Sequence, residues 1–181
     1  MLFAHDTAAV LRAAVDLVNS AEEPDTLTTV AQLDAWYAKH GYTGRHDRDE
    51  AELATLRALR SVLRELLTSD RDRAAERVNA MLAEADALPQ LVRHDDLDWH
   101  IHAVAADAPL DRRVVVETAM AMIDVIRADE LSRLSLCADD RCGGLVLDLS
   151  RNRSRRFCGT TCANRNAVAA YRARGRREAG T

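Results

Sequence analysis

Apolar residues recur at intervals of three and four positions along the first two thirds of the chain, the spacing that places them on one face of an α-helix. The longest such stripe consists of Leu53, Leu56, Leu59, Leu63 and Leu66. Helices are predicted over residues 7–19, 30–40, 53–67, 74–85 and 110–125. The fold class that follows is mainly α, with a helical N-terminal domain.

The pattern changes to alternation in the segment "DWHIHAV". Trp99 and Ile101 alternate with His100 and His102 there, which is typical of a β-strand. Residues near Leu91 are the predicted partner of this strand. The helical domain is therefore expected to carry a small β-hairpin.

All four cysteines lie near the C-terminal end, at Cys137, Cys142, Cys158 and Cys162, with the spacing C-x4-C-x15-C-x3-C. Between the two pairs, "LVLDLS" is predicted to form a strand, "RNRS" a turn and "RRFC" the returning antiparallel strand. A helical pattern begins at "CANRNAVAAYRAR". The predicted order is loop, β-hairpin, loop and helix, a treble-clef-like or GATA-like finger by analogy of fold.

Two pairs of cysteines are typical of a structural zinc site, in which Zn²⁺ binds four thiolates at about 2.3 Å. The sequence predicts one structural Zn²⁺ held by all four cysteines. An iron–sulfur cluster and redox-active thiols are the alternatives. Four cysteine ligands leave no open coordination position, which argues against a catalytic metal. A module of about 45 residues buries little core, so metal binding should supply most of its folding free energy.

The net charge of −4 conceals an asymmetry. The chain from Cys137 onward carries ten arginines against four acidic residues, a charge of +6, whereas the remainder carries −10. No acidic residue lies between Leu149 and Arg177. A basic surface of this kind suits contacts with phosphates and entry into a DNA groove. The predicted nucleic-acid contacts are Arg151, Arg153, Arg155, Arg156, Arg165, Arg172 and Arg176.

Two other interpretations of these arginines stay open. Some of them can support the fold of the finger itself, and the last few can belong to a solvated basic tail. In the last helix, Ala167, Val168 and Tyr171 occupy a different sector from the arginines and are expected to pack on the hairpin.

The sequence gives little support for an enzyme. No Ser/His/Asp arrangement, phosphate-binding glycine loop or outstanding pair of carboxylates is visible. Asn19, at the end of an apolar helix, and His100 and His102, on one side of the predicted strand, are candidates for an effector pocket. The alternatives are a helix-capping asparagine and ordinary surface histidines.

The start of the chain lacks the basic region of a signal peptide, and no stretch approaches the ~20 apolar residues that span a bilayer. We therefore expect a cytoplasmic protein with no membrane partner. In that compartment, clustered cysteines bind metal more often than they form disulfides.

The segment "LDLSRNRSRRFCGTTCANRNAVAAYRAR" resembles the CGNR zinc finger, found at the C-terminus of a family described as stress-induced bacterial transcription regulators. The match lies in the four cysteines, in the "RRFC" step and in "CANR". Ala163 replaces the glycine of the motif, and Phe157 replaces its usual tryptophan. Through this resemblance Asn164, next to Arg165, joins the candidate nucleic-acid contacts.

The N-terminal part resembles the ABATE domain that accompanies this finger, in "AVDLVNS", "LDAWYAKHG" and "LRALRSVLRELL". The resemblance implies an ABATE-like regulatory or dimerisation domain over residues 1–133 and a CGNR-type zinc finger over residues 134–178. It implies a transcription regulator of the stress response that binds double-stranded DNA and associates with the nucleoid, with an effector that it does not identify.

A single finger makes few base contacts, so we expect a homodimer that reads two half-sites. The alternative function is a zinc-stabilised adaptor that binds protein or RNA without sequence-specific recognition of DNA.

Overall fold

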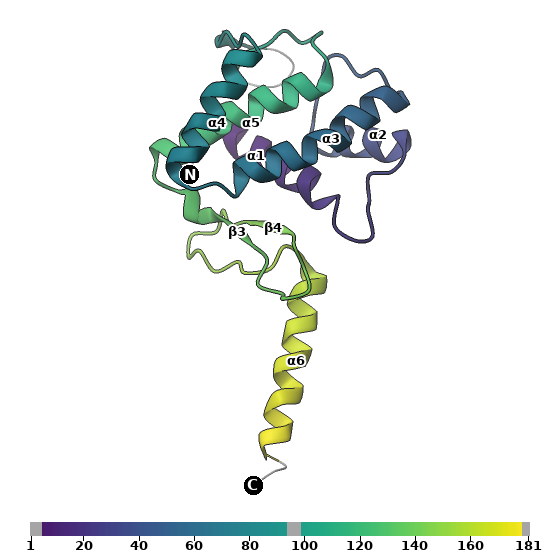
Figure 1. The fold of residues 1–181 in the computed structure, drawn as a ribbon, viewed down its shortest axis with the longest axis vertical. Coiled ribbons are helices and arrows are strands. Elements are labelled where there is room, and N and C mark those ends of the chain that lie inside the picture. The colour runs from purple at the N-terminus through teal and green to yellow at the C-terminus, as the bar shows by residue number, and fades with distance from the viewer. Residues whose placement is uncertain (1–4, 94–98, 179–181) are drawn as a thin grey trace.

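The protein consists of a helical body from which a small finger and a long terminal helix extend (Figure 1). The computed structural model describes residues 5–93 and 99–178. The helices of the body are α1 (His5–Asn19), α2 (Val30–Lys39), α3 (Glu50–Leu67), α4 (Arg71–Glu84) and α5 (Leu110–Arg127). The predicted mainly helical fold class is confirmed.

Three of these helices begin at a residue whose side chain caps the free N–H groups of the first turn. Thr29 and Gln32 form a capping box at the start of α2. Asp49 accepts a hydrogen bond from the backbone of Glu52 at the start of α3, and Asp70 plays the same role at α4. These caps explain why the helices start where the apolar stripes do.

The apolar stripes meet in one continuous core. Helix α5 packs against α1, α3 and α4, and α1 also contacts α3. Leu17 of α1, Leu63 of α3 and Met122 of α5 are completely buried in this core. Burial of such side chains is the main source of stability of the body.

The predicted hairpin after α4 is present. Strands β1 (Gln90–Val92) and β2 (His100–His102) pair antiparallel, with Leu91 opposite Ile101. Leu91 and Ile101 face solvent, so the hairpin contributes little to the core of the body.

The finger begins immediately after the body. A short 3-10 turn, η1 (Leu131–Arg133), leads into β3 (Leu134–Leu136), which pairs antiparallel with β4 (Leu145–Leu147). The final helix is α6 (Thr160–Glu178). The finger therefore has a hairpin and a terminal helix, as predicted.

The pairing within that hairpin differs from the prediction. The partner of β4 is β3, and the "RRFC" segment forms no strand. The other edge of β4 is already engaged, because the N–H and carbonyl of Leu145 bond to the side chain of Asn19. Asp148 accepts the backbone N–H groups of Ser150 and Arg155 in the turn that follows. The returning segment bonds instead to the first cysteine loop, where Ala138 donates its N–H to the carbonyl of Arg156.

Helix α6 extends away from the rest of the molecule (Figure 1). The prediction that its apolar sector packs on the hairpin is wrong, since Val168 is 48% exposed and Tyr171 is 73% exposed. Most apolar side chains of the hairpin are already packed elsewhere, although Leu136 of β3 is 57% exposed. Leu145 and Leu147 are buried in the core of the body, and Val146 is buried among the cysteines.

Among the helices of residues 5–93 and 99–178, none is both long and apolar enough to span a bilayer.

Candidate metal centre and basic surface

Four cysteine side chains from separate parts of the finger meet at one point. Cys137 follows β3, Cys142 lies in the loop before β4, and Cys158 and Cys162 flank the start of α6. All four Sγ atoms lie within 4.8 Å of one another, with 3.5 Å between Cys142 and Cys158 and 3.7 Å between Cys158 and Cys162. Thiolates bound at about 2.3 Å to a tetrahedral Zn²⁺ lie about 3.8 Å apart. The four cysteines therefore form a metal site that fits one structural zinc ion.

Backbone N–H groups support the sulfur atoms. The N–H of Gly144 points to Cys142 Sγ at 3.4 Å, and the N–H of Cys158 points to Cys137 Sγ at 3.5 Å. A Cβ atom on Gly144 would lie 3.2 Å from Cys158 Sγ and 3.3 Å from Cys142 Sγ. A side chain at position 144 would therefore crowd the sulfur atoms, which favours glycine there.

Two of the four thiols, Cys158 and Cys162, are poorly placed to ionise without a cation. The pKa of Cys137 is instead lowered, because its burial is outweighed by hydrogen bonds from the backbone of Cys158 and Asp139. Burial, together with the neighbouring thiols, raises the pKa of Cys158 well above its ordinary value and that of Cys162 to about 11. A divalent ion stabilises such thiolates and displaces their protons. The chemistry of the donor set therefore agrees with its geometry.

An ion pair holds the first cysteine loop against α6. Arg165 Nη1 lies 2.9 Å from Asp139 Oδ2, and the carboxylate of Asp139 is only 4% exposed. The other carboxylate oxygen of Asp139 accepts the N–H of Arg141. Arg165, a predicted nucleic-acid contact, is thus engaged within the finger.

A second ion pair anchors the returning segment to the base of the finger. Arg153 donates to Ser132 Oγ and to the Glu130 carboxylate. Glu130 also accepts from Arg133, which in turn donates to the carbonyl oxygens of Asp148 and Ser150. Arg153, another predicted nucleic-acid contact, therefore faces the junction between body and finger.

Other predicted contacts lie on the open surface of the finger. Arg155 is exposed but donates to the carbonyls of Phe157 and Cys158, beside the metal site. The side chain of Arg176 lies outside the described residues, although its backbone belongs to α6. The remaining exposed candidates are Arg151, Arg156, Asn164 and Arg172, and Arg174 is exposed beside them.

The finger is fixed to the body at its first cysteine loop. The side-chain amide of Asn19, the last residue of α1, donates to the carbonyl of Leu145 at 2.9 Å and accepts its N–H at 2.6 Å. Glu22 accepts the N–H of Gly143, and Arg64 of α3 donates to the carbonyl of Gly143. We call these three side chains the docking clamp.

The three candidates for an effector pocket are not brought together. Asn19 lies at the junction with the finger, whereas β2, which carries His100 and His102, lies at the end of the body remote from the finger, beside the grey trace in Figure 1. His100 Nε2 and His102 Nε2 are 3.0 Å apart, on the same side of the strand.

Sequence reasoning missed the acidic partners that organise the finger. Asp139 and Asp148 are two of only four acidic residues from Cys137 onward, and both are buried. Isolated acidic residues within an arginine-rich segment are a signal that could have identified internal ion pairs. Glu22 and Arg64 carry no comparable signal, because they depend on how the two regions pack.

Two family models match the chain, one over the helical body and one over the finger. The ABATE family model, described as "Putative stress-induced transcription regulator", matches residues 11–129, and the CGNR zinc finger model matches residues 133–175. No curated protein matches the chain. The matches cover both the helical body and the cysteine site. The chain thus belongs to the ABATE family and carries a CGNR zinc finger after the ABATE domain.

Proposed function

We propose that the protein is a transcription regulator that binds double-stranded DNA through the exposed face of its zinc finger. The observation that carries this proposal is the separation of charges within the finger. Asp139 and Asp148 are buried, while Arg151, Arg156 and Arg172 face solvent. Apart from the exposed Asp140, the charges described on the open surface are therefore cationic, which suits binding to phosphates.

Helix α6 is the element best suited to enter a groove. Its 19 residues extend about 28 Å at 1.5 Å per residue. It stands clear of the body (Figure 1), and a DNA major groove admits an α-helix. Asn164 and Arg172 are exposed side chains of the types that bind adenine and guanine edges.

We propose that zinc has a structural role and that the protein is not an enzyme. The four cysteines would close the coordination sphere, and because Cys158 and Cys162 lie at the N-terminal end of α6, an ion bound there would fix the proposed DNA-binding helix to the rest of the finger. The expected place of action is the nucleoid in the cytoplasm. Because one finger contacts few base pairs, a second copy is needed for a site of useful specificity.

The test is selection of bound duplexes from random DNA by the zinc-loaded protein at near-physiological salt. An enriched motif that is lost with Cys158→Ala supports sequence-specific recognition, and a two-fold repeat in the motif supports a dimer. No enrichment contradicts the proposal and favours the alternative, a zinc-stabilised module that binds protein or RNA.

A pair of arginine variants tests whether DNA binding depends on the surface of the finger or on the overall charge of the protein. Arg172→Ala should weaken DNA binding several-fold and reduce the salt dependence by roughly one phosphate contact. Arg12→Ala removes an exposed arginine of the body and should leave both unchanged. Equal losses in the two variants would show that overall charge, and not α6, determines binding.

A further inference from the structure

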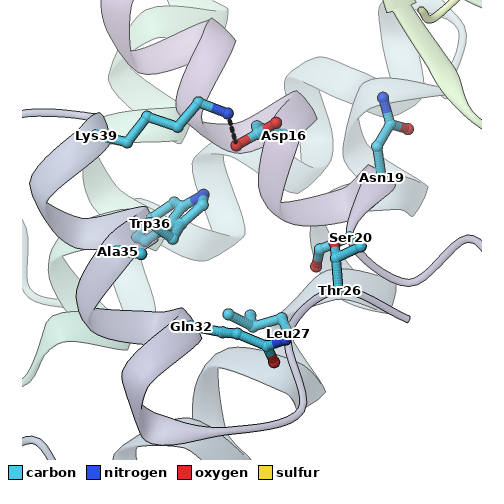
Figure 2. A pocket seen from close by; sticks show the side chains of 9 residues that line it. All are labelled: Asp16, Asn19, Ser20, Thr26, Leu27, Gln32, Ala35, Trp36 and Lys39. Atoms are coloured by element: carbon cyan, nitrogen blue, oxygen red, sulfur yellow. Dashed lines mark hydrogen bonds and ion pairs between the residues drawn. The ribbon is translucent and has the colours of Figure 1, made fainter. Parts of the chain in front are cut away.

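A small cavity lies in the body between α1, α2 and the loop that joins them (Figure 2). Its volume is about 270 Å³, close to the lower end of the roughly 300–1,000 Å³ typical of ligand pockets. Leu27 and Ala35 contribute apolar surface, and Asp16 and Lys39 contribute charges. The cavity therefore has room for one small molecule with both apolar and polar parts.

The indole of Trp36 presents an unsatisfied donor at this cavity. The residue is only 5% exposed, its ring stacks on Tyr42, and Nε1 has no hydrogen-bond partner. Figure 2 shows the indole nitrogen turned toward the pair formed by Lys39 and Asp16. A buried tryptophan N–H usually has an acceptor, so a ligand oxygen is a suitable partner for Nε1.

Asp16 supplies an acceptor beside this donor. Its Oδ2 atom accepts from both Lys39 Nζ and His40 Nε2, each at 2.8 Å. Within the described part of the chain, Oδ1 accepts no hydrogen bond. The His40 and Lys39 contacts hold the pKa of Asp16 below its ordinary value, so the group remains a carboxylate at neutral pH.

Trp36 offers a hydrogen-bond donor and Asp16 an acceptor, so a complementary ligand group carries an acceptor next to a donor. We propose that the cavity binds a small neutral molecule with an amide-type group, whose carbonyl oxygen accepts from Trp36 and whose N–H donates to Asp16. The apolar part of the ligand lies against Leu27 and Ala35. A carboxylate ligand is disfavoured because it has no donor and carries the same charge as Asp16.

The cavity and the docking clamp share one segment of chain. Asn19, Thr26 and Leu27 line the cavity, while Asn19 binds Leu145 of β4 and Glu22 binds Gly143 just before it. Asn19 Oδ1 would lie only 3.4 Å from a Cβ atom at position 144, beside the sulfurs. A ligand that orders this segment therefore acts on the finger, a consequence that rests on the function proposed above.

The binding test uses benzamide as the probe and benzoate as its charged counterpart of the same shape. Trp99→Phe leaves Trp36 as the only tryptophan, so its Nε1–H signal can be followed by NMR in the zinc-loaded full chain. Benzamide should shift this signal saturably, and benzoate should bind at least tenfold more weakly.

Two alanines of α2 provide a matched pair of variants. Ala35 lines the cavity, whereas Ala38, one turn along the same helix, is exposed and does not. In the Trp99→Phe background, Ala35→Leu should fill the cavity and abolish the benzamide shift, and Ala38→Leu should retain it. No shift in the folded Trp99→Phe protein, or an equal shift in both leucine variants, would overturn the proposal.

The coupling is tested with the DNA motif from the selection experiment. Saturating benzamide should change the DNA affinity several-fold in the parent protein and not in Ala35→Leu. If benzamide binds at Trp36 but no motif is found, the cavity proposal stands and the DNA proposal fails. If a motif is bound but benzamide gives no shift, the DNA proposal stands and the cavity proposal fails.

Discussion

In the helical body, leucines from α1, α3 and α5 fill a common core, whereas in the finger the buried apolar cluster contains only Val146 and two cysteines, Cys137 and Cys162. Leu145 and Leu147 of the finger belong to the core of the body instead. The body can therefore be stabilised by hydrophobic burial, while the finger depends on its metal, on internal ion pairs and on its contact with the body. The two regions should therefore be sensitive to different substitutions.

The largest effect should come from the loss of a metal ligand. Cys158→Ala leaves three thiols, so the finger should lose its zinc, its fold and all DNA binding, while the body keeps its helices. Zinc content, circular dichroism and DNA binding would be measured together. Loss of the body's cooperative unfolding transition in this variant would show that the two regions are one folding unit.

Truncation of a core side chain should destabilise the body and leave the zinc site intact. Leu63 is completely buried in the body, and Leu63→Ala should lower the free energy of unfolding by about 2–5 kcal/mol. Because the residue is absent from the cysteine cluster, zinc stoichiometry should stay at one per chain. Denaturant titration and metal analysis would test this. A variant that folds but loses zinc would contradict the claim that the metal site is independent of the core of the body.

A smaller effect is expected at the docking clamp. Asn19→Ala leaves the backbone groups of Leu145 without partners, and Leu145 is only 1% exposed. The expected cost is about 1–3 kcal/mol. Hydrogen exchange at the Leu145 amide should accelerate while zinc remains bound.

The control for this variant is Asn79→Ala, which truncates an exposed asparagine on α4. It should leave the Leu145 exchange rate unchanged. If both variants leave it unchanged, the amide of Asn19 has no energetic role in the clamp, and Glu22, Arg64 and apolar contacts hold the finger to the body.

Structural features that depend on short-range sequence patterns could be predicted from the sequence. The apolar period of the helices and the spacing of the cysteines sufficed for the fold class and the zinc site. The roles of Arg153 and Arg165 could not be predicted, because the ion pairs to Glu130 and Asp139 arise only when separate segments pack together. The same holds for Asn19, whose two hydrogen bonds to Leu145 cross the junction between body and finger.

The hairpin pairing failed for a related reason. Alternation in "LVLDLS" correctly indicates β4, but it does not identify the partner strand. The returning segment does not pair with the other edge of β4, where the side chain of Asn19 binds both backbone groups of Leu145. A strand period carries no information about such side-chain contacts.

The last prediction distinguishes the two regions by the sign of their pH dependence. Burial raises the pKa of Glu117 on α5 to about 7, against 4.5 for the ordinary group, although the Arg113 cation opposes the change. Folding therefore favours the protonated acid, and this stabilisation is complete below about pH 4.5 and is lost as the pH rises to about 7. Asp16 and Asp25 have lowered pKa values and act in the opposite sense, but only in acid near or below pH 3.8.

Between these limits, acid should stabilise the body through Glu117 and weaken the finger, because protons compete with zinc for the thiolates. Glu117→Gln should flatten the dependence of the body's unfolding free energy on pH from about 4.5 to 7 and leave the pH profile of zinc release unaltered. Denaturant titrations at several pH values, with zinc content measured in parallel, would test both. If the pH dependence of the unfolding free energy is the same in Glu117→Gln, the carboxyl group of Glu117 is hydrated and its pKa is not raised. The opposite responses of body and finger to acid would then not be explained by Glu117.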